Sequence, residues 1–218
     1  MIKAVIFDMD GLMFDSEKAT YECYVEVLEK LGLSMSEEFY KTLLGKTLKT
    51  CYQLMYTEYG KDFPMDQVLT DVHELLNQNF HKDGVPKKKG LMELLTYLKE
   101  NNYLTIVATS SGRKRVDDIL SLANVTHYFN NSICGDEVTN GKPNPEVFLR
   151  ACEKLGVQPN EAIVLEDSEA GIQAAHNANI PVICIPDMKY PTSEFESLTE
   201  RIYQSLYDVI DYLEERKW

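Results

Sequence analysis

Three apolar segments of the sequence each end in polar side chains that could do chemistry. The segments are IKAVIFD (2–8), LTIVAT (104–109) and AIVLED (162–167). The polar residues at or just beyond their ends are Asp8, Asp10, Thr109, Ser110, Glu166 and Asp167. Short apolar segments rich in β-branched and aromatic residues are typical of buried strands. Ligands bind beyond the carboxyl ends of the strands in an open parallel sheet, so we expect these side chains to meet at one edge.

A cation and two hydroxyl groups among these carboxylates indicate a phosphate site. Lys142 precedes the helix that Asn144 and Pro145 are expected to begin, and it would reach the same edge. Several carboxylates repel one another unless a cation lies among them, and oxygen-only ligands favour magnesium over zinc. A hydroxyl and an ammonium beside the metal suit a phosphoryl group, which a carboxylate can attack to form an aspartyl-phosphate. These residues therefore predict magnesium-dependent phosphoryl transfer.

Helical patterns alternate with the apolar segments, which predicts βαβ units and a mostly parallel sheet. VICI (182–185) is a fourth strand segment, and NSIC (131–134) is a weaker fifth. We expect an α/β fold with a Rossmann-like, doubly wound parallel sheet. Between about Phe14 and Lys82 only helical patterns occur. Residues 14–82 are therefore expected to form an inserted, all-helical cap domain, and residues 1–13 and 83–218 to form the catalytic core.

The composition argues against several classes of partner. The chain has 218 residues and a formal net charge of −13, whereas contacts to nucleic-acid phosphates need a basic face. No apolar run approaches the roughly 18 residues of a membrane span. Five cysteines without close pairs are typical of reduced thiols, and the four histidines show no metal-ligand spacing. We expect a cytoplasmic monomer that binds a small phosphorylated metabolite, with no nucleic-acid or membrane partner.

Four short motifs resemble those of the haloacid dehalogenase superfamily. They are DMDGLMFDSE (8–17), ATSS (108–111), GKPNPEVF (141–148) and LEDSEAGI (165–172). Each motif alone is weak, but their order and spacing cover nearly the whole chain. The most similar branch has a helical cap inserted after the first motif and holds β-phosphoglucomutase and many sugar-phosphate phosphatases.

The resemblance implies a catalytic role for five residues. Asp8 is similar to the family's nucleophile, which is also a metal ligand. Asp10 resembles the general acid/base, whose backbone carbonyl binds the metal. Thr109 resembles the phosphate-binding hydroxyl, helped by the amide of Ser110. Lys142 resembles the lysine that steadies the nucleophile and the phosphate.

The resemblance also implies the remaining metal ligands, and two groups of lysines are interpreted from the sequence itself. Asp167 resembles a direct magnesium ligand, and Glu166 resembles one that binds directly or through water. Lys46 and Lys49 either reach from the cap toward a substrate phosphate or are solvated lysines at a helix end. Lys87 to Lys89 are expected to form an exposed charge run.

The leading interpretation is a magnesium-dependent phosphatase, with sugar phosphates as the expected substrates and an aspartyl-phosphate intermediate. The first alternative is a hexose-phosphate mutase of the β-phosphoglucomutase type. That pattern carries a His shortly after the first motif and an Arg in a cap loop. The nearest positions here are Thr20 and Leu48, which favours the phosphatase. An alternative of another class is a phospho-accepting signalling module, which also combines acids, Thr and Lys on a parallel sheet and would hold a stable phospho-form.

Overall fold

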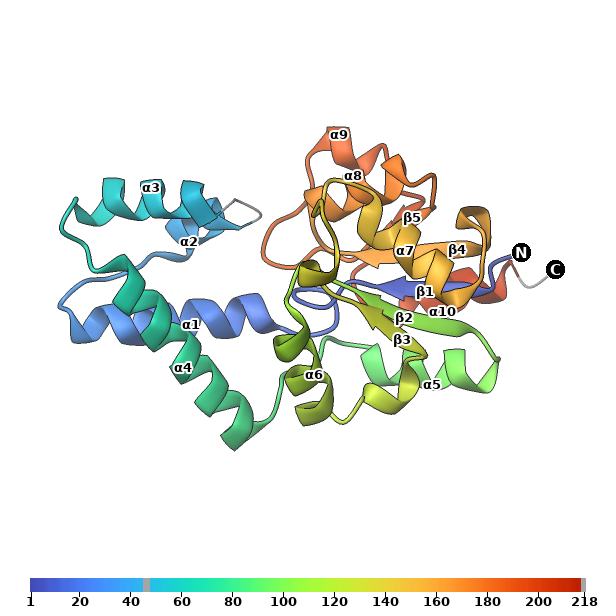
Figure 1. Cartoon of the computed structure of the whole chain (residues 1–218), viewed down its shortest axis with the longest axis horizontal. Coiled ribbons are helices and arrows are strands. Elements are labelled where there is room, and N and C mark those ends of the chain that lie inside the picture. Colours follow the sequence, from blue (N-terminus) through green and yellow to red (C-terminus); the bar gives the residue numbers. More distant parts are fainter. Residues whose placement is uncertain (45–47, 217–218) are drawn as a thin grey trace. The chain divides into compact units, whose positions relative to one another are not determined.

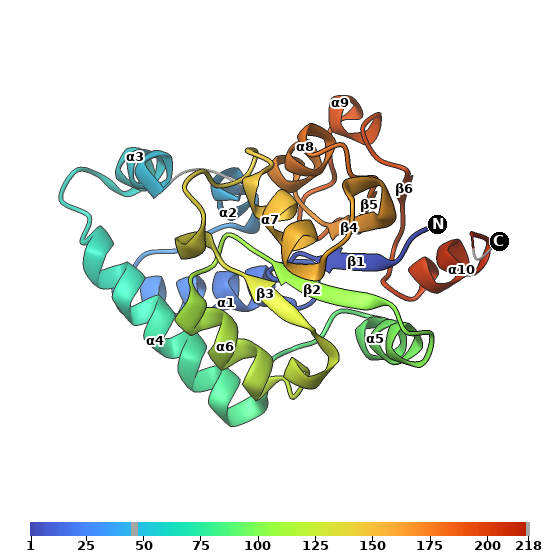
Figure 2. The same ribbon diagram turned by 45° about the vertical axis from the view of Figure 1, so that its right-hand side comes forward.

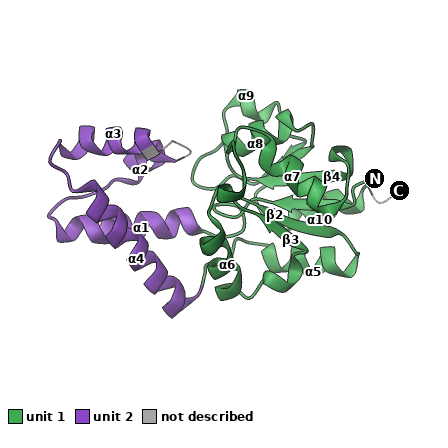
Figure 3. Cartoon of the chain, in the orientation of Figure 1, with its two compact units in different colours: residues 1–15, 85–218 green, residues 16–84 purple. Residues whose placement is uncertain are grey.

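The computed structural model describes residues 1–44 and 48–216, and the chain forms two compact units (Figure 1). Residues 1–15 and 85–218 form one unit, and residues 16–84 form the other (Figure 3). The boundaries thus lie after residues 15 and 84, not after the expected residues 13 and 82. The reason is local pairing: Phe14 forms an antiparallel bridge with Lys87, and the backbone N of Asp15 donates to the carbonyl of Pro86.

Six parallel strands form the sheet of the first unit. They are β1 (Ala4–Phe7), β2 (Leu104–Ala108), β3 (Asn131–Ile133), β4 (Ala162–Glu166), β5 (Val182–Cys184) and β6 (Arg201–Ile202). Their order across the sheet is β3-β2-β1-β4-β5-β6. β1 pairs with both β2 and β4, and Phe7 lies opposite Val107 and Leu165. The strand order reverses at β1, so its carboxyl end is the place where such sheets bind ligands.

Helices cover both faces of this sheet. They are α5 (Leu91–Glu100), α6 (Arg113–Leu122), α7 (Glu146–Leu155), α8 (Glu169–Asn177), α9 (Ser193–Glu196) and α10 (Asp208–Glu214). Short 3₁₀ turns are η1 (Thr126–Tyr128), η2 (Gly135–Glu137) and η3 (Pro159–Glu161). α5 and α6 lie on one face, and α7 and α8 lie on the other (Figure 2). The expected doubly wound α/β fold is confirmed, and the short β6 is an additional strand.

The core of this unit forms because the central strands are apolar on both faces. Every residue of β1 is buried. Ile6 and Val164 pack with Phe148 of α7 and Ile172 of α8 in one buried apolar cluster. Burying side chains of this size contributes about 1.5–3 kcal/mol each, which makes the sheet a rigid platform for the loops at its carboxyl edge.

The second unit contains helices and no strand within its described residues. Its helices are α1 (Ser16–Lys30), α2 (Glu37–Leu43), α3 (Leu48–Tyr59) and α4 (Met65–Asp83). α1 packs against α4, with Val27 and Leu28 of α1 and Val72 and Leu76 of α4 buried. None of the described helices is both long and apolar enough to cross a membrane.

Candidate active site

Asp8 lies directly beyond β1, at the point where the strand order reverses. Its backbone N donates to the carbonyl of Leu165 at 3.0 Å, which keeps the residue in line with the sheet, and its side chain is buried. The chain then turns at Gly11, whose φ is +84°. A Cβ at this position would lie 2.3 Å from Oδ2 of Asp167. Glycine therefore supplies both the turn and the space that lets the first loop approach Asp167.

A group of carboxylates surrounds this turn. Asp8, Glu166 and Asp167 offer oxygen atoms that all lie within 4.8 Å of one another. Negative charges this close repel one another unless a cation lies among them. Carboxylate oxygens without His or Cys are the donor set that magnesium prefers. These three residues therefore fit a magnesium ion.

Lys142 joins the carboxylates from the loop that precedes α7. Its Nζ donates to Oδ1 of Asp8 at 2.5 Å and to Oε1 of Glu166 at 2.6 Å. The side chain is only 5% exposed, and Nζ lies 4.8 Å from the ring centre of Phe148. Burial alone would lower the pKa of Lys142, but the charges of Asp8 and Glu166 raise it above its usual value. Lys142 is therefore a fixed positive charge beside Asp8.

The shared burial also changes the acidity of the carboxyl groups. Burial raises the pKa of Asp8 from 3.8 to about 7, Lys142 opposes this shift, and the charge of Glu166 adds to it. The pKa of Asp167 is raised by burial and by the charges of Glu166 and Asp8. A bound cation would favour the ionised carboxylates, because it replaces repulsion with attraction.

Glu166 is the most completely hydrogen-bonded of the three acids. Its Oε2 accepts from the backbone N of Asp167 and from the backbone N and Oγ of Ser168, at 2.8–2.9 Å. The residue is fully buried, and a Cβ on Gly171 would lie 1.7 Å from Oε1. Glu166 is therefore locked between Lys142 and the first turn of α8.

The hydroxyl residues beyond β2 lie at the same edge of the sheet. Thr109 is buried, and its backbone N donates to the carbonyl of Ile133 at 3.1 Å. Its Oγ1 accepts from the backbone N of Ser111 at 3.1 Å. Ser110 is exposed. The loop is held close to β3, because a Cβ on Gly135 would lie 2.1 Å from the carbonyl oxygen of Ser110.

Asp10 turns toward the start of α6. Its Oδ2 accepts from Oγ of Ser111 at 2.7 Å, and its Oδ1 accepts from Nη2 of Arg115 at 2.8 Å. Sequence reasoning assigned no role to either donor. A signal for Arg115 was present, since α6 begins with consecutive cations and has no acid in its first turn, which opposes the helix dipole.

The structure describes only one of the two cap lysines, Lys49. Lys49 lies in the first turn of α3 and is exposed. Lys46 lies outside the described residues. Their suggested contact with a substrate phosphate stays a prediction.

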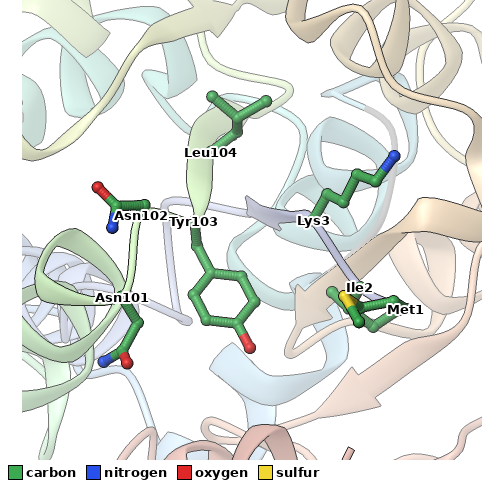
Figure 4. A pocket seen from close by; sticks show the side chains of 7 residues that line it. All are labelled: Met1, Ile2, Lys3, Asn101, Asn102, Tyr103 and Leu104. Atoms are coloured by element: carbon green, nitrogen blue, oxygen red, sulfur yellow. The ribbon is translucent and has the colours of Figure 1, made fainter. Parts of the chain in front are cut away.

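A separate cavity of about 410 Å³ lies at the opposite edge of the sheet. It is lined by residues that precede β1 and β2, together with the first residue of β2: Met1, Ile2, Lys3, Asn101, Asn102, Tyr103 and Leu104 (Figure 4). Ligands of open parallel sheets bind at the carboxyl ends of the strands, where Asp8 and Thr109 lie. The candidate site is therefore the carboxylate group and not this cavity.

Comparison with protein families yields one match that spans most of the chain. The model of the haloacid dehalogenase-like hydrolases matches residues 5–185. A phosphorylated carbohydrates phosphatase of Thermotoga maritima is 30% identical over 179 residues, which are 82% of each chain. A probable pseudouridine-5'-phosphatase of Drosophila melanogaster is 30% identical over 213 residues, covering 93% of this chain and 89% of that protein.

The fold of this chain also matches that of a solved structure. The crystal structure of a putative β-phosphoglucomutase from Thermotoga maritima superposes with a TM-score of 0.83 and 28% identity. The match covers 98% of this chain and 99% of the other. The similarity therefore includes the sheet that carries the carboxylates.

Proposed function

Because this chain belongs to the haloacid dehalogenase-like hydrolases and is an enzyme of phosphatase type, we propose that it hydrolyses a small phosphorylated metabolite with the help of magnesium. The observation that carries this proposal is the buried group of Asp8, Lys142, Glu166 and Asp167. It combines a nucleophile, a fixed cation and oxygen ligands for a metal at the switch point of the sheet. Family membership leaves the signalling-module alternative without support.

The five free cysteines suit a cytoplasmic protein.

The first half of the reaction forms an aspartyl-phosphate. A carboxylate oxygen of Asp8 attacks phosphorus, and the bond from phosphorus to the leaving oxygen breaks. Asp10 donates its proton to that oxygen, so that an alcohol leaves. Lys142 and the hydroxyl of Thr109 stabilise the negative charge of the transferring group. A magnesium ion held by Asp8, Asp167 and Glu166 would neutralise the remaining charge.

The second half of the reaction returns Asp8 to its starting state. Asp10, now ionised, takes a proton from water as the water oxygen attacks phosphorus. The bond between phosphorus and Asp8 breaks, and inorganic phosphate leaves. Atoms and protons balance over the two steps: phosphate ester and water are consumed, and alcohol and phosphate are produced.

Sugar phosphates are the proposed substrate class. The support is the similarity to the Thermotoga maritima phosphatase of phosphorylated carbohydrates, at 30% identity. The test is a phosphate-release screen over sugar phosphates and nucleotides, each with and without magnesium and each repeated with Asp8→Asn. We expect magnesium-dependent release from at least one sugar phosphate that disappears in Asp8→Asn. Release that persists in Asp8→Asn would contradict the proposal.

A hexose-phosphate mutase is the second candidate, because a solved structure described as a putative β-phosphoglucomutase resembles this chain. A mutase must keep its phospho-enzyme from water while a doubly phosphorylated sugar reorients. Arg can grip such a second phosphate with two parallel hydrogen bonds, whereas Leu48 offers none. Thr20 cannot carry the charge of a His, and its Oγ1 donates to the carbonyl of Ser16 within α1 at 2.7 Å. Water is therefore expected to take the phosphoryl group.

One assay separates the two candidates. β-Glucose 1-phosphate is supplied, and glucose 6-phosphate and inorganic phosphate are measured in the same sample, the former with glucose-6-phosphate dehydrogenase. We expect phosphate to form faster. Glucose 6-phosphate forming many times faster would establish the mutase instead.

A further inference from the structure

The first turn of α6 carries three consecutive cations: Arg113, Lys114 and Arg115. This turn has no acidic residue. The amino end of a helix is the positive end of its dipole, so each cation there costs about 0.3–1 kcal/mol. A local feature that opposes the helix is expected where another part of the molecule or a function requires it.

Interactions near α6 account for two of these cations. Arg113 forms ion pairs with Asp117 and Glu137, at 3.2 and 2.6 Å. Lys114 pairs with Asp118 one turn later, and its side chain is 92% exposed. Arg115 differs, because its ion pair is with Asp10, which lies 105 residues away in the sequence.

The contact holds the Asp10 carboxylate at both oxygens. Nη2 of Arg115 lies 2.8 Å from Oδ1, and Oγ of Ser111 lies 2.7 Å from Oδ2. The side chains of Arg115 and Asp10 are 34% and 21% exposed. A serine hydroxyl can rotate, but a guanidinium is planar and directs its donors. The two contacts together therefore set the orientation of the carboxylate.

We infer that Arg115 is a positioning residue for Asp10 and that it aligns this carboxyl group with the leaving oxygen of the substrate. The inference rests on the proposed function, in which Asp10 moves a proton to that oxygen. Both contacts are compatible with the protonated acid, because each carboxyl oxygen keeps a lone pair that can accept from Arg115 or Ser111. Proton transfer requires the two oxygens to lie within hydrogen-bond reach, and an orientation fixed before the reaction costs nothing during it. Arg115 acts through Asp10 and does not touch the reacting atoms.

The test compares leaving groups that do and do not need a proton. Arg115→Met removes the donors and keeps much of the length of the side chain, Arg115→Lys keeps the charge, and Lys114→Met is the matched control on the same turn. Each variant is assayed with the best sugar phosphate from the screen and with p-nitrophenyl phosphate, whose nitrophenolate leaves unprotonated. The value compared is kcat/KM, which reports the steps up to departure of the leaving group.

We expect Arg115→Met to lower kcat/KM for the sugar phosphate about tenfold more than for p-nitrophenyl phosphate. Arg115→Lys should recover part of this loss, and Lys114→Met should match the wild type with both substrates. Equal losses with both substrates would overturn the inference. Weaker binding of the sugar phosphate when Arg115→Met is added to the inactive Asp8→Asn protein would also overturn it, because Arg115 would then bind the substrate itself.

A second measurement does not depend on activity. The melting temperatures of Asp10→Asn, Arg115→Met and the double variant are compared without metal or substrate. We expect the double variant to shift by less than the sum of the single shifts, because contacting residues are coupled. Additive shifts would contradict the pairing. If the wild type releases phosphate from neither substrate, the proposed function fails, while this comparison still decides whether Arg115 holds Asp10.

Discussion

Asp8 combines burial, a neighbouring lysine and neighbouring carboxylates, and this combination predicts the effect of Asp8→Asn. The amide keeps the shape of the side chain but loses the nucleophilic charge. We expect kcat to fall about a thousandfold or more, and the metal-free fold to survive or gain stability because carboxylate repulsion falls. Phosphate-release kinetics and thermal melting check the two parts. A variant that keeps more than about a tenth of the wild-type rate would contradict nucleophilic catalysis by Asp8.

The raised pKa of Asp8 predicts how the metal-free protein responds to pH. Its pKa is about 7 in the folded protein and ordinarily 3.8, so the folded state binds this proton more tightly than the unfolded chain does. The contribution to the free energy of unfolding is therefore largest below about pH 4 and is lost as the pH rises to about 7. We expect the melting temperature of Asp8→Asn, measured in EDTA, to fall less than that of the wild type across this range. Parallel curves for the two proteins would contradict the assignment.

Glu166 and Asp167 are neighbours with different surroundings, and their alanine variants should differ accordingly. Asp167→Ala removes a repelled carboxylate, so we expect a higher magnesium requirement with little loss of metal-free stability. Glu166→Ala removes one of the two acceptors of Lys142 and leaves the donors at the start of α8 without their acceptor, which costs about 1–3 kcal/mol for an unsatisfied buried group. Magnesium titrations of activity and melting without metal measure both effects. A larger rise in magnesium requirement for Glu166→Ala would reverse the assignment of the direct ligand.

The paired segments 13–15 and 86–88 connect the sheet to the helical insertion, and Lys88 ties them to the core. The backbone N of Lys88 donates to the carbonyl of Met13. Its Nζ lies 2.6 Å from Oδ1 of Asp187 and 3.1 Å from Oδ1 of Asp15. Lys88 is only 15% exposed, so the expected exposed charge run of Lys87 to Lys89 is wrong at its middle position. Two carboxylates had to converge on this lysine for it to be buried.

This arrangement predicts that Lys88→Met destabilises the protein while Lys87→Met does not. Burial alone would lower the pKa of Lys88, but hydrogen bonds and charges from Asp187 and Asp15 raise it above its usual value. Removing the lysine leaves Asp187 mostly buried without its cation, so we expect a loss of about 2 kcal/mol or more in the free energy of unfolding. Denaturant unfolding of the two variants measures it. Equal, small effects would show that the buried pair contributes nothing.

The free energy of unfolding of the whole chain should depend on magnesium. Asp8, Glu166 and Asp167 come together only in the folded protein, so an ion that binds this group stabilises the native state. The gain is roughly 2.7 kcal/mol at a hundredfold excess over the dissociation constant. We expect a higher melting temperature in magnesium and no turnover in excess EDTA, with Asp8→Asn as the control for weakened binding. Full activity in EDTA would remove magnesium from the mechanism.

Local sequence was sufficient to predict the sheet and the residues at its carboxyl edge. Parallel strands covered on both faces require short apolar runs, and β1, β2 and β4 follow such runs closely. Side chains just beyond these runs meet because the strands share one direction, which brings Asp8, Glu166 and Asp167 together. β6 was not predictable in this way, because its two residues, Arg201 and Ile202, carry no apolar pattern.

Only the tertiary structure decided which donors hold Asp10 and Asp187. Asp10 accepts from Ser111 and Arg115, which lie 101 and 105 residues away in the sequence. Asp187 accepts from Lys88, which lies 99 residues away. The cations at the start of α6 indicate that something there offsets the helix dipole, but they do not identify Asp10 as the partner of Arg115. A lysine in a basic run has the same local pattern whether it faces water or a carboxylate. The hydrophobic pattern determines which way a strand or helix faces, because burial of apolar area depends on the type of each residue and on the spacing of apolar residues along the element. An ion pair forms only when a second segment places an opposite charge within about 3 Å, and the two segments come this close only once the sheet has assembled.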